Sequence, residues 1–113
     1  FRRAGVSDRV RIHVGPAFDR LREIEREGPF DLAFIDADKG GYPDYLAWCA
    51  RHLRVGGTVI ADNVFRRAAI PLPGDDPNAM IGIRCFNETL AQSGAFRATM
   101  LPLEDGFAVG VKL

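Results

Sequence analysis

Apolar positions along the chain follow two periods, and the way these periods alternate predicts an α/β fold. Phe30–Ile35 is a nearly continuous apolar run, typical of a strand covered on both faces, and Thr58–Ala61 is a second apolar run. Residues 42–53 lie between them and carry an apolar stripe at helical spacing, formed by Leu46, Cys49, Ala50 and Leu53. A strand, a helix and a second strand in this order indicate a parallel βαβ unit.

The residues before this unit predict one further strand and one further helix. Val10–Val14 alternates apolar and polar residues, as expected of a short strand with one buried face. Apolar residues then recur at helical spacing over 17–27, and Gly28-Pro29 ends that helix.

The residues after the unit predict a loop, a helix and a hairpin. Pro71–Pro77 holds three prolines, a glycine and two aspartates, which favours a loop. Asn78 is expected to cap a helix running to about Ala91, whose inward residues are Ile83, Phe86 and Leu90. The last two predicted strands are Phe96–Leu101 and Phe107–Lys112. Asp105-Gly106 between them favours a hairpin, so one late strand should run antiparallel.

Composition narrows the function classes. The 113 residues are 47% hydrophobic and carry 15 basic and 15 acidic side chains, so no net charge favours nucleic acid or an anionic membrane. The basic doublets Arg2-Arg3 and Arg66-Arg67 are too short for a nucleic-acid footprint and are interpreted as solvated surface. Cys49 and Cys85 stand beside apolar neighbours and are interpreted as buried thiols in a reducing, cytoplasmic compartment. No apolar run approaches the roughly 20 residues of a membrane span.

Polar side chains follow both apolar runs of the central unit. Asp36, Asp38 and Lys39 follow the first run, and Asp62-Asn63 follows the second. The carboxyl ends of parallel strands meet at one edge of the sheet, where open α/β sheets bind their ligands. Carboxylate and amide oxygens suit magnesium, calcium or manganese. The sequence therefore predicts a hard-metal site at which Lys39 acts as a base, where metal charge and partial burial favour its neutral amine.

Each of these residues also has an ordinary structural interpretation. Asp38 could cap the helix near Tyr42, Asp62-Asn63 is a common turn dipeptide, and a single lysine is usually solvated. Their joint occurrence across one βαβ unit, with Gly56-Gly57 leading into the second strand, favours the metal site over these separate interpretations.

The same motifs resemble the cation-dependent class I O-methyltransferases of the caffeoyl-CoA, catechol and bacterial small-molecule types. The resemblance rests first on Phe34-Ile35-Asp36-Ala37-Asp38-Lys39, Tyr42, Tyr45, Leu53-Arg54-Val55-Gly56-Gly57 and Ala61-Asp62-Asn63-Val64. It extends to Ala4-Gly5-Val6, Arg9-Val10, Gly15-Pro16-Ala17, Arg84-Cys85-Phe86-Asn87 and Leu101-Pro102-Leu103-Glu104-Asp105-Gly106.

The resemblance implies a Rossmann-like class I methyltransferase sheet, mostly parallel, with an antiparallel strand in its C-terminal hairpin. Asp36, Asp62 and Asn63 would be the divalent-metal ligands and Lys39 the base. Ala17 and Asp38 would lie near S-adenosylmethionine. The reaction would transfer its methyl group to a hydroxyl of a small phenolic or vicinal-diol acceptor chelated to the metal. The resemblance also implies a homodimer, which a chain without net charge permits.

The chain departs from the family pattern in two respects. Phe65-Arg66-Arg67-Ala68 replaces the family's usual wall against the acceptor, which leaves a catechol-like preference open. The glycine-rich cofactor turn and the acidic residue that follows the second strand of the family are not found in the sequence. Residues 1–113 therefore resemble a partial domain that lacks the N-terminal part of the fold and begins near the end of a helix. A sheet gap would then separate 10–14 from 31–35, unless the first strand pairs directly with its successor or across a dimer.

Two alternatives remain at this stage. A receiver-like signalling domain is also α/β and binds magnesium beside an acidic strand end, but Lys39 lies too near Asp36 for that pattern. A non-catalytic fragment or scaffold would keep the fold without holding cofactor.

Overall fold

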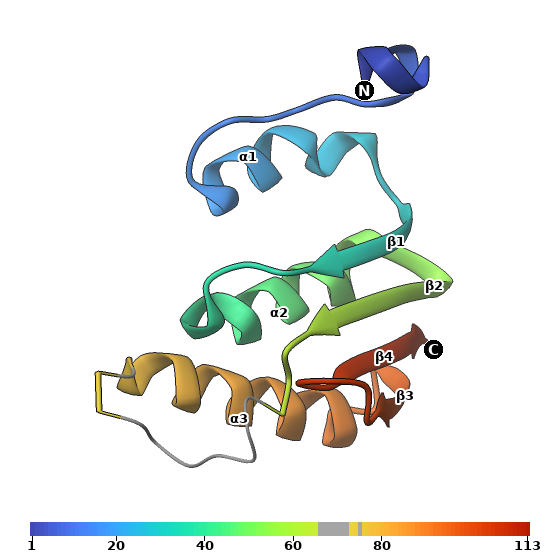
Figure 1. Ribbon diagram of the computed structural model, residues 1–113. Helices are drawn as coiled ribbons and strands as arrows, with labels where there is room; N and C mark the ends of the chain where they lie inside the picture. The colour runs from blue at the N-terminus through green and yellow to red at the C-terminus, as the bar shows by residue number, and fades with distance from the viewer. Residues whose placement is uncertain (66–72, 75) are drawn as a thin grey trace.

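The computed structural model describes residues 1–65, 73–74 and 76–113 of the chain (Figure 1). The strands form one four-stranded sheet in the order β1-β2-β4-β3. β1 and β2 are parallel, and β4 is antiparallel to both of its neighbours, so the predicted single antiparallel strand is confirmed. The longer elements are α1 (Ala17–Ile24), β1 (Phe30–Ile35), α2 (Tyr42–His52), β2 (Leu53–Asp62), α3 (Pro77–Gln92), β3 (Phe96–Leu101) and β4 (Phe107–Lys112).

The register between β1 and β2 places their carboxyl ends side by side. Ile35 pairs with Ala61, so the next residue along each strand is an aspartate. β2 begins at Leu53, five residues before the predicted start, because Leu53 already pairs with Phe30. The register shift that follows includes Gly56, whose φ of 75° is a conformation that glycine adopts readily.

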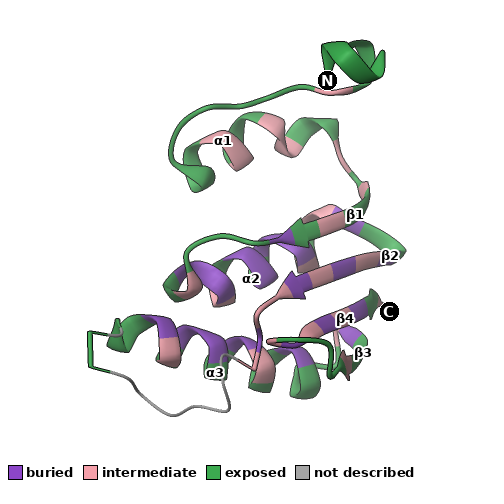
Figure 2. Ribbon diagram, in the orientation of Figure 1, coloured by how far each residue is buried: buried purple, intermediate pink, exposed green. Residues whose placement is uncertain are grey.

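The hydrophobic core lies on one face of the sheet, where α2 and α3 cover it (Figure 2). Residues of this face, including Ile35, Val59 and Ala61, are buried. The prediction that β1 is covered on both faces is wrong, because Leu32 is 55% and Phe34 is 56% exposed on its other face. Among the described residues, α2 and α3 both pack on the opposite face of the sheet, which leaves this face of β1 exposed.

Helix α3 begins two residues earlier than predicted, because its cap is Asp76 rather than Asn78. The Asp76 carboxylate accepts a hydrogen bond of 2.9 Å from the backbone N–H of Asn78. Pro77 then occupies the first turn, where its missing N–H costs no helical hydrogen bond. The predicted inward residues Ile83, Phe86 and Leu90 are buried, which confirms that face. The predicted loop Pro71–Pro77 lies partly outside the described residues.

The predicted strand Val10–Val14 is wrong. These residues form no regular element, and Ile12 and Val14 are exposed. In Figure 1 this segment runs past α1 instead of joining the sheet, so direct pairing with β1 is wrong as well. The alternating pattern favours an extended backbone, but a strand needs a partner to satisfy its N–H and C=O groups.

The two cysteines have different surroundings. Cys49 is buried in α2 as predicted, and burial raises the pKa of its thiol to about 12. The prediction of a second buried thiol is wrong, because Cys85 lies on the exposed side of α3. No helix of the described residues is both long and apolar enough to cross a membrane.

The turn of the β3–β4 hairpin supports the residues that follow β2. The backbone N–H groups of Val64 and Phe65 donate to the carbonyls of Gly106 and Asp105, at 3.1 and 2.8 Å. A Cβ atom on Gly106, whose φ is 84°, would lie 2.4 Å from Cδ2 of Phe65. Only glycine therefore fits here without displacing the Phe65 ring or straining the backbone.

Gly106→Ala is expected to lower the free energy of unfolding by about 2 kcal/mol, because the left-handed conformation alone costs a residue with Cβ about 1–2 kcal/mol. Thermal unfolding measures the loss. Gly94→Ala is the matched control, since Gly94 has a φ of 71° and a Cβ atom at this position would meet nothing within 4 Å. Equal losses in both variants would show that contact with Phe65 does not contribute.

Candidate functional site

The turn after β1 is built by Asp38. Its carboxylate accepts hydrogen bonds from the backbone N–H of Gly41 at 2.9 Å and from the hydroxyl of Tyr45 at 2.6 Å. Each oxygen of this carboxylate therefore has one donor, Gly41 from the turn and Tyr45 from α2. This agrees with the capping interpretation of Asp38, while contact with a cofactor stays a prediction.

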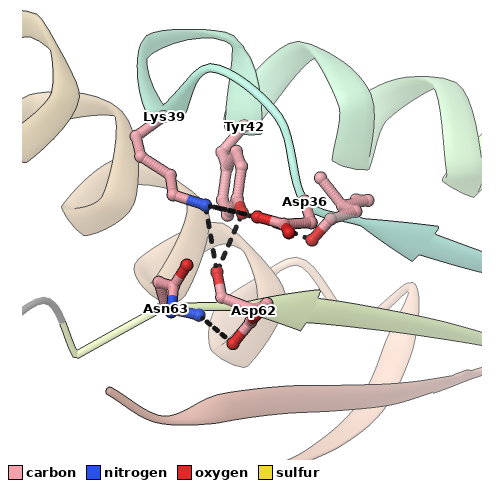
Figure 3. Close-up of polar contacts among 6 residues, drawn as sticks. Asp36, Lys39, Tyr42, Asp62 and Asn63 are labelled. Carbon is pink, nitrogen blue, oxygen red and sulfur yellow. Dashed lines mark hydrogen bonds and ion pairs between the residues drawn. The ribbon is translucent and has the colours of Figure 1, made fainter.

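Lys39 points back toward the ends of both strands (Figure 3). Its Nζ lies 3.3 Å from Asp36 Oδ1 and 3.5 Å from the backbone carbonyl oxygen of Asp62. The Lys39 side chain is only 13% exposed, whereas that of Asp36 is 56% exposed. Lys39 is therefore held within the site and is not a solvated surface lysine, and Asp36 stays open to a ligand.

Tyr42 lies beneath Lys39, and sequence reasoning gave it no role beyond the motif. Its hydroxyl is 2.5 Å from Lys39 Nζ, 2.8 Å from the carbonyl oxygen of Asp62 and 3.3 Å from that of Ile35. Burial raises the pKa of Tyr42 by more than the neighbouring lysine lowers it, so the hydroxyl stays neutral and can donate. Its spacing of three residues from Lys39 was the signal that could have found it.

Asp62 and Asn63 form a tight turn at the end of β2. Asp62 Oδ1 accepts a hydrogen bond of 2.7 Å from the backbone N–H of Asn63, whose φ is 59°. Asparagine tolerates this left-handed conformation better than most residues, and such backbone outliers occur often at functional sites. In the hydrogen bonds between described residues, Asp36 and Asp62 each accept through Oδ1 alone.

Helix α3 supports both sides of the site. A Cβ atom on Gly82 would lie 2.2 Å from the carbonyl oxygen of Lys39, so the helix packs directly on the Lys39–Gly41 turn. Further along the helix, Asn87 donates from Nδ2 to the carbonyl oxygen of Val64 at 2.9 Å. The two strand ends therefore rest on one rigid element.

A cavity of about 210 Å³ lies beside the carboxyl end of β1. Ala17 and Leu21 of α1 line one side, Asp36 and Ala37 line the strand end, and Tyr45 contributes from α2. The ring of Phe18 stacks on that of Tyr45 with centroids 4.5 Å apart, which joins α1 to α2 at this point. Ala17 and Asp36 therefore border the same space, although they lie far apart in the chain.

The structure brings Asp36, Lys39, Asp62 and Asn63 to one edge of the sheet, as the βαβ pattern predicts (Figure 3). The donor set of two carboxylates and one amide, with Asp36 exposed and the other two half-exposed, fits a hard divalent cation. Within the described ranges, no cluster of three or more His, Cys, Asp and Glu side chains is placed to hold a metal ion. Any metal bound here would therefore depend on the Asn63 amide as its third protein ligand.

Comparison with known proteins gives one consistent family. The family model described as O-methyltransferase matches residues 1–113. The catechol O-methyltransferase of Niastella koreensis is 40% identical over 112 residues, and that of Mycobacterium tuberculosis is 39% identical over 114 residues. These alignments cover 97% and 96% of the chain but 48% and 51% of the relatives. The chain therefore spans about half the length of the curated relatives it matches.

Solved structures agree with this comparison. The O-methyltransferase TomG from Streptomyces achromogenes, solved in complex with SAM, has a TM-score of 0.88 at 34% identity. An O-methyltransferase from Bacillus cereus, in complex with SAH, has a TM-score of 0.86 at 38% identity. Each alignment covers 98% of this chain, and 53% and 54% of the respective solved chains.

Proposed function

Because the chain belongs to the O-methyltransferase family, we propose that it supplies the metal-binding and acceptor-binding half of an S-adenosylmethionine-dependent O-methyltransferase. The observation that carries this proposal is the placement of Asp36 with Lys39, and of Asp62-Asn63, at the adjoining carboxyl ends of two parallel strands. Family membership excludes the receiver-like alternative. The proposed acceptor is a small phenol or vicinal diol, a chemistry that the catechol O-methyltransferase relatives support by name.

Asp36, Asp62 and Asn63 are the residues that would hold the cation. Three protein oxygens leave about half of a six-coordinate shell for water or for the two oxygens of a vicinal diol. A divalent cation in this place supplies positive charge that favours ionisation of the acceptor hydroxyl. Asp36 is the most exposed of the three and would form the side of the site that faces the acceptor.

Lys39 is proposed to take the proton that the acceptor hydroxyl loses. Its amine lies at the strand ends, held by Tyr42 and Asp36, so little further ordering is needed before the proton moves. The ionised oxygen then attacks the methyl carbon as the carbon–sulfur bond breaks, and S-adenosylhomocysteine leaves as a neutral thioether.

The cavity beside Ala17 is proposed to hold part of the cofactor. Its volume of about 210 Å³ is below the roughly 300–1,000 Å³ of typical small-molecule pockets, so these residues would form only part of the cofactor site. The SAM and SAH complexes of the structural neighbours support this choice of cofactor. Asp38 would act mainly by shaping the turn that borders the cavity.

Calorimetric titration tests the proposal. Magnesium should bind at one site, and catechol should bind detectably only when magnesium is present, because the metal supplies most of its contacts. S-adenosylmethionine should bind weakly to the 113 residues, with or without magnesium. Catechol binding of equal strength without magnesium would contradict acceptor chelation. Absence of magnesium binding would favour the alternative of a non-catalytic scaffold.

A further inference from the structure

The hydroxyl of Tyr42 joins three chain segments of the site. Tyr42 is fully buried, and its ring packs edge-on against Phe86 with centroids 5.5 Å apart. The position of the hydroxyl is therefore set by the core and not by the exposed turn. With one hydrogen and its lone pairs, the hydroxyl can donate to the Asp62 carbonyl at 2.8 Å and accept from Lys39 at 2.5 Å.

The carbonyl that accepts from Tyr42 belongs to the peptide group between Asp62 and Asn63. The N–H of this same peptide group donates to Asp62 Oδ1 at 2.7 Å. Both polar atoms of the peptide group are thus bonded, on opposite sides, and the next residue has the left-handed φ of 59°. If the peptide group rotated, the direction of the Asn63 side chain and the carboxylate of Asp62 would both change.

We propose that Tyr42 is a positioning residue, whose hydroxyl orients the Asp62–Asn63 peptide group and so directs the Asp62 and Asn63 side chains toward a shared divalent cation. The proposal rests on the function proposed above. The same hydroxyl holds Lys39 beside Asp36, so one buried group sets the geometry of two ligands and of the base. Groups that orient metal ligands in this way typically change metal affinity by about 10–100-fold when they are removed.

Tyr42→Phe tests the proposal because it removes the hydroxyl and keeps the ring. Ser93→Ala is the control, since it also removes a single side-chain hydroxyl. The Ser93 hydroxyl accepts from the backbone N–H of Ala95 at 3.3 Å, just after α3 and away from the metal-binding segment. Magnesium affinity is measured by calorimetry without cofactor, and amide hydrogen exchange is measured at Asn63 and at Val59 in the centre of β2.

In Tyr42→Phe, magnesium should bind about tenfold more weakly, and exchange should quicken at Asn63 but not at Val59. In Ser93→Ala, magnesium affinity should stay within about twofold of wild type. Faster exchange at both Asn63 and Val59 would mean that Tyr42 merely stabilises the fold, and the proposal would be overturned. Unchanged magnesium affinity in Tyr42→Phe would overturn it too.

Asp36→Ala separates these failures from failure of the proposed function. If Asp36→Ala abolishes magnesium binding and Tyr42→Phe has no effect, the metal site stands and only the role of Tyr42 is wrong. If Asp36→Ala leaves magnesium affinity unchanged, the proposed site is wrong, and the role of Tyr42 is lost with it.

Discussion

Asp62→Ala is expected to abolish divalent-metal binding with little loss of stability. Its carboxylate supplies one of only two negative ligands in the proposed set, so magnesium affinity should fall by more than about 100-fold, beyond what outer-shell changes produce. The side chain is half-exposed, and its described hydrogen bond is the one from the backbone N–H of Asn63. The free energy of unfolding should therefore change by about 1 kcal/mol or less. Calorimetry and thermal unfolding measure the two quantities.

Asp31→Ala is the control for this variant. Asp31 is an exposed aspartate near the opposite end of β1 and is paired with Arg54 at 2.6 Å. The change removes the same charge from the sheet at a distance from the site, so magnesium affinity should stay within about twofold. If Asp62→Ala retains wild-type magnesium affinity, the assignment of the metal site is wrong.

Lys39→Met is expected to slow methyl transfer without weakening magnesium binding. As the proposed base, Lys39 should contribute a rate factor of about 10²–10⁴ to methyl transfer, so turnover of a catechol acceptor should fall by that factor. Magnesium affinity should not fall. The Lys39 ammonium lies 3.3 Å from Asp36 and repels a magnesium ion bound there, so replacing the lysine relieves this repulsion. Steady-state kinetics need an enzyme in which this half is joined to a cofactor-binding half, whereas calorimetry with magnesium alone uses residues 1–113.

Lys112→Met is the matched control, since Lys112 is the only other lysine in the sequence. Its Nζ donates to the carbonyl oxygen of Leu53, near the start of β2 and away from the site. Methyl transfer in this variant should equal that of wild type. If Lys39→Met keeps full turnover, another group takes the proton; if it loses magnesium binding as Asp62→Ala does, Lys39 serves the metal site instead.

The Asp62 and Lys39 variants together separate metal binding from proton transfer. Lys39 Nζ donates to the backbone carbonyl of Asp62, so the two side chains belong to one hydrogen-bonded region. If the substitutions merely distorted this region, magnesium binding should weaken in both variants. Opposite effects on magnesium affinity would instead follow from charge, since one change removes a negative ligand and the other removes a neighbouring cation.

The amino-acid sequence alone determined the central βαβ unit of this protein and the polar residues at the carboxyl ends of its two strands. Strong apolar runs and one helical stripe predicted β1, α2 and much of β2, because these segments are held by local periodicity and by burial within the same unit. Parallel pairing then brought Asp36 beside Asp62, since any right-handed strand–helix–strand crossover places both carboxyl ends at one edge. The inward residues of α3 and the hairpin were predictable for the same local reasons.

Tertiary structure decided what depends on partners distant in sequence. Val10–Val14 has a strand pattern but joins no strand in the described part of the chain, and the apolar run of β1 is exposed on one face. The role of Tyr42 depends on carbonyl groups that the fold brings to its hydroxyl from Ile35 and from the distant Asp62. Local patterns report the preference of a segment for a conformation. Pairing, burial and hydrogen bonding also depend on which atoms the rest of the fold places against it.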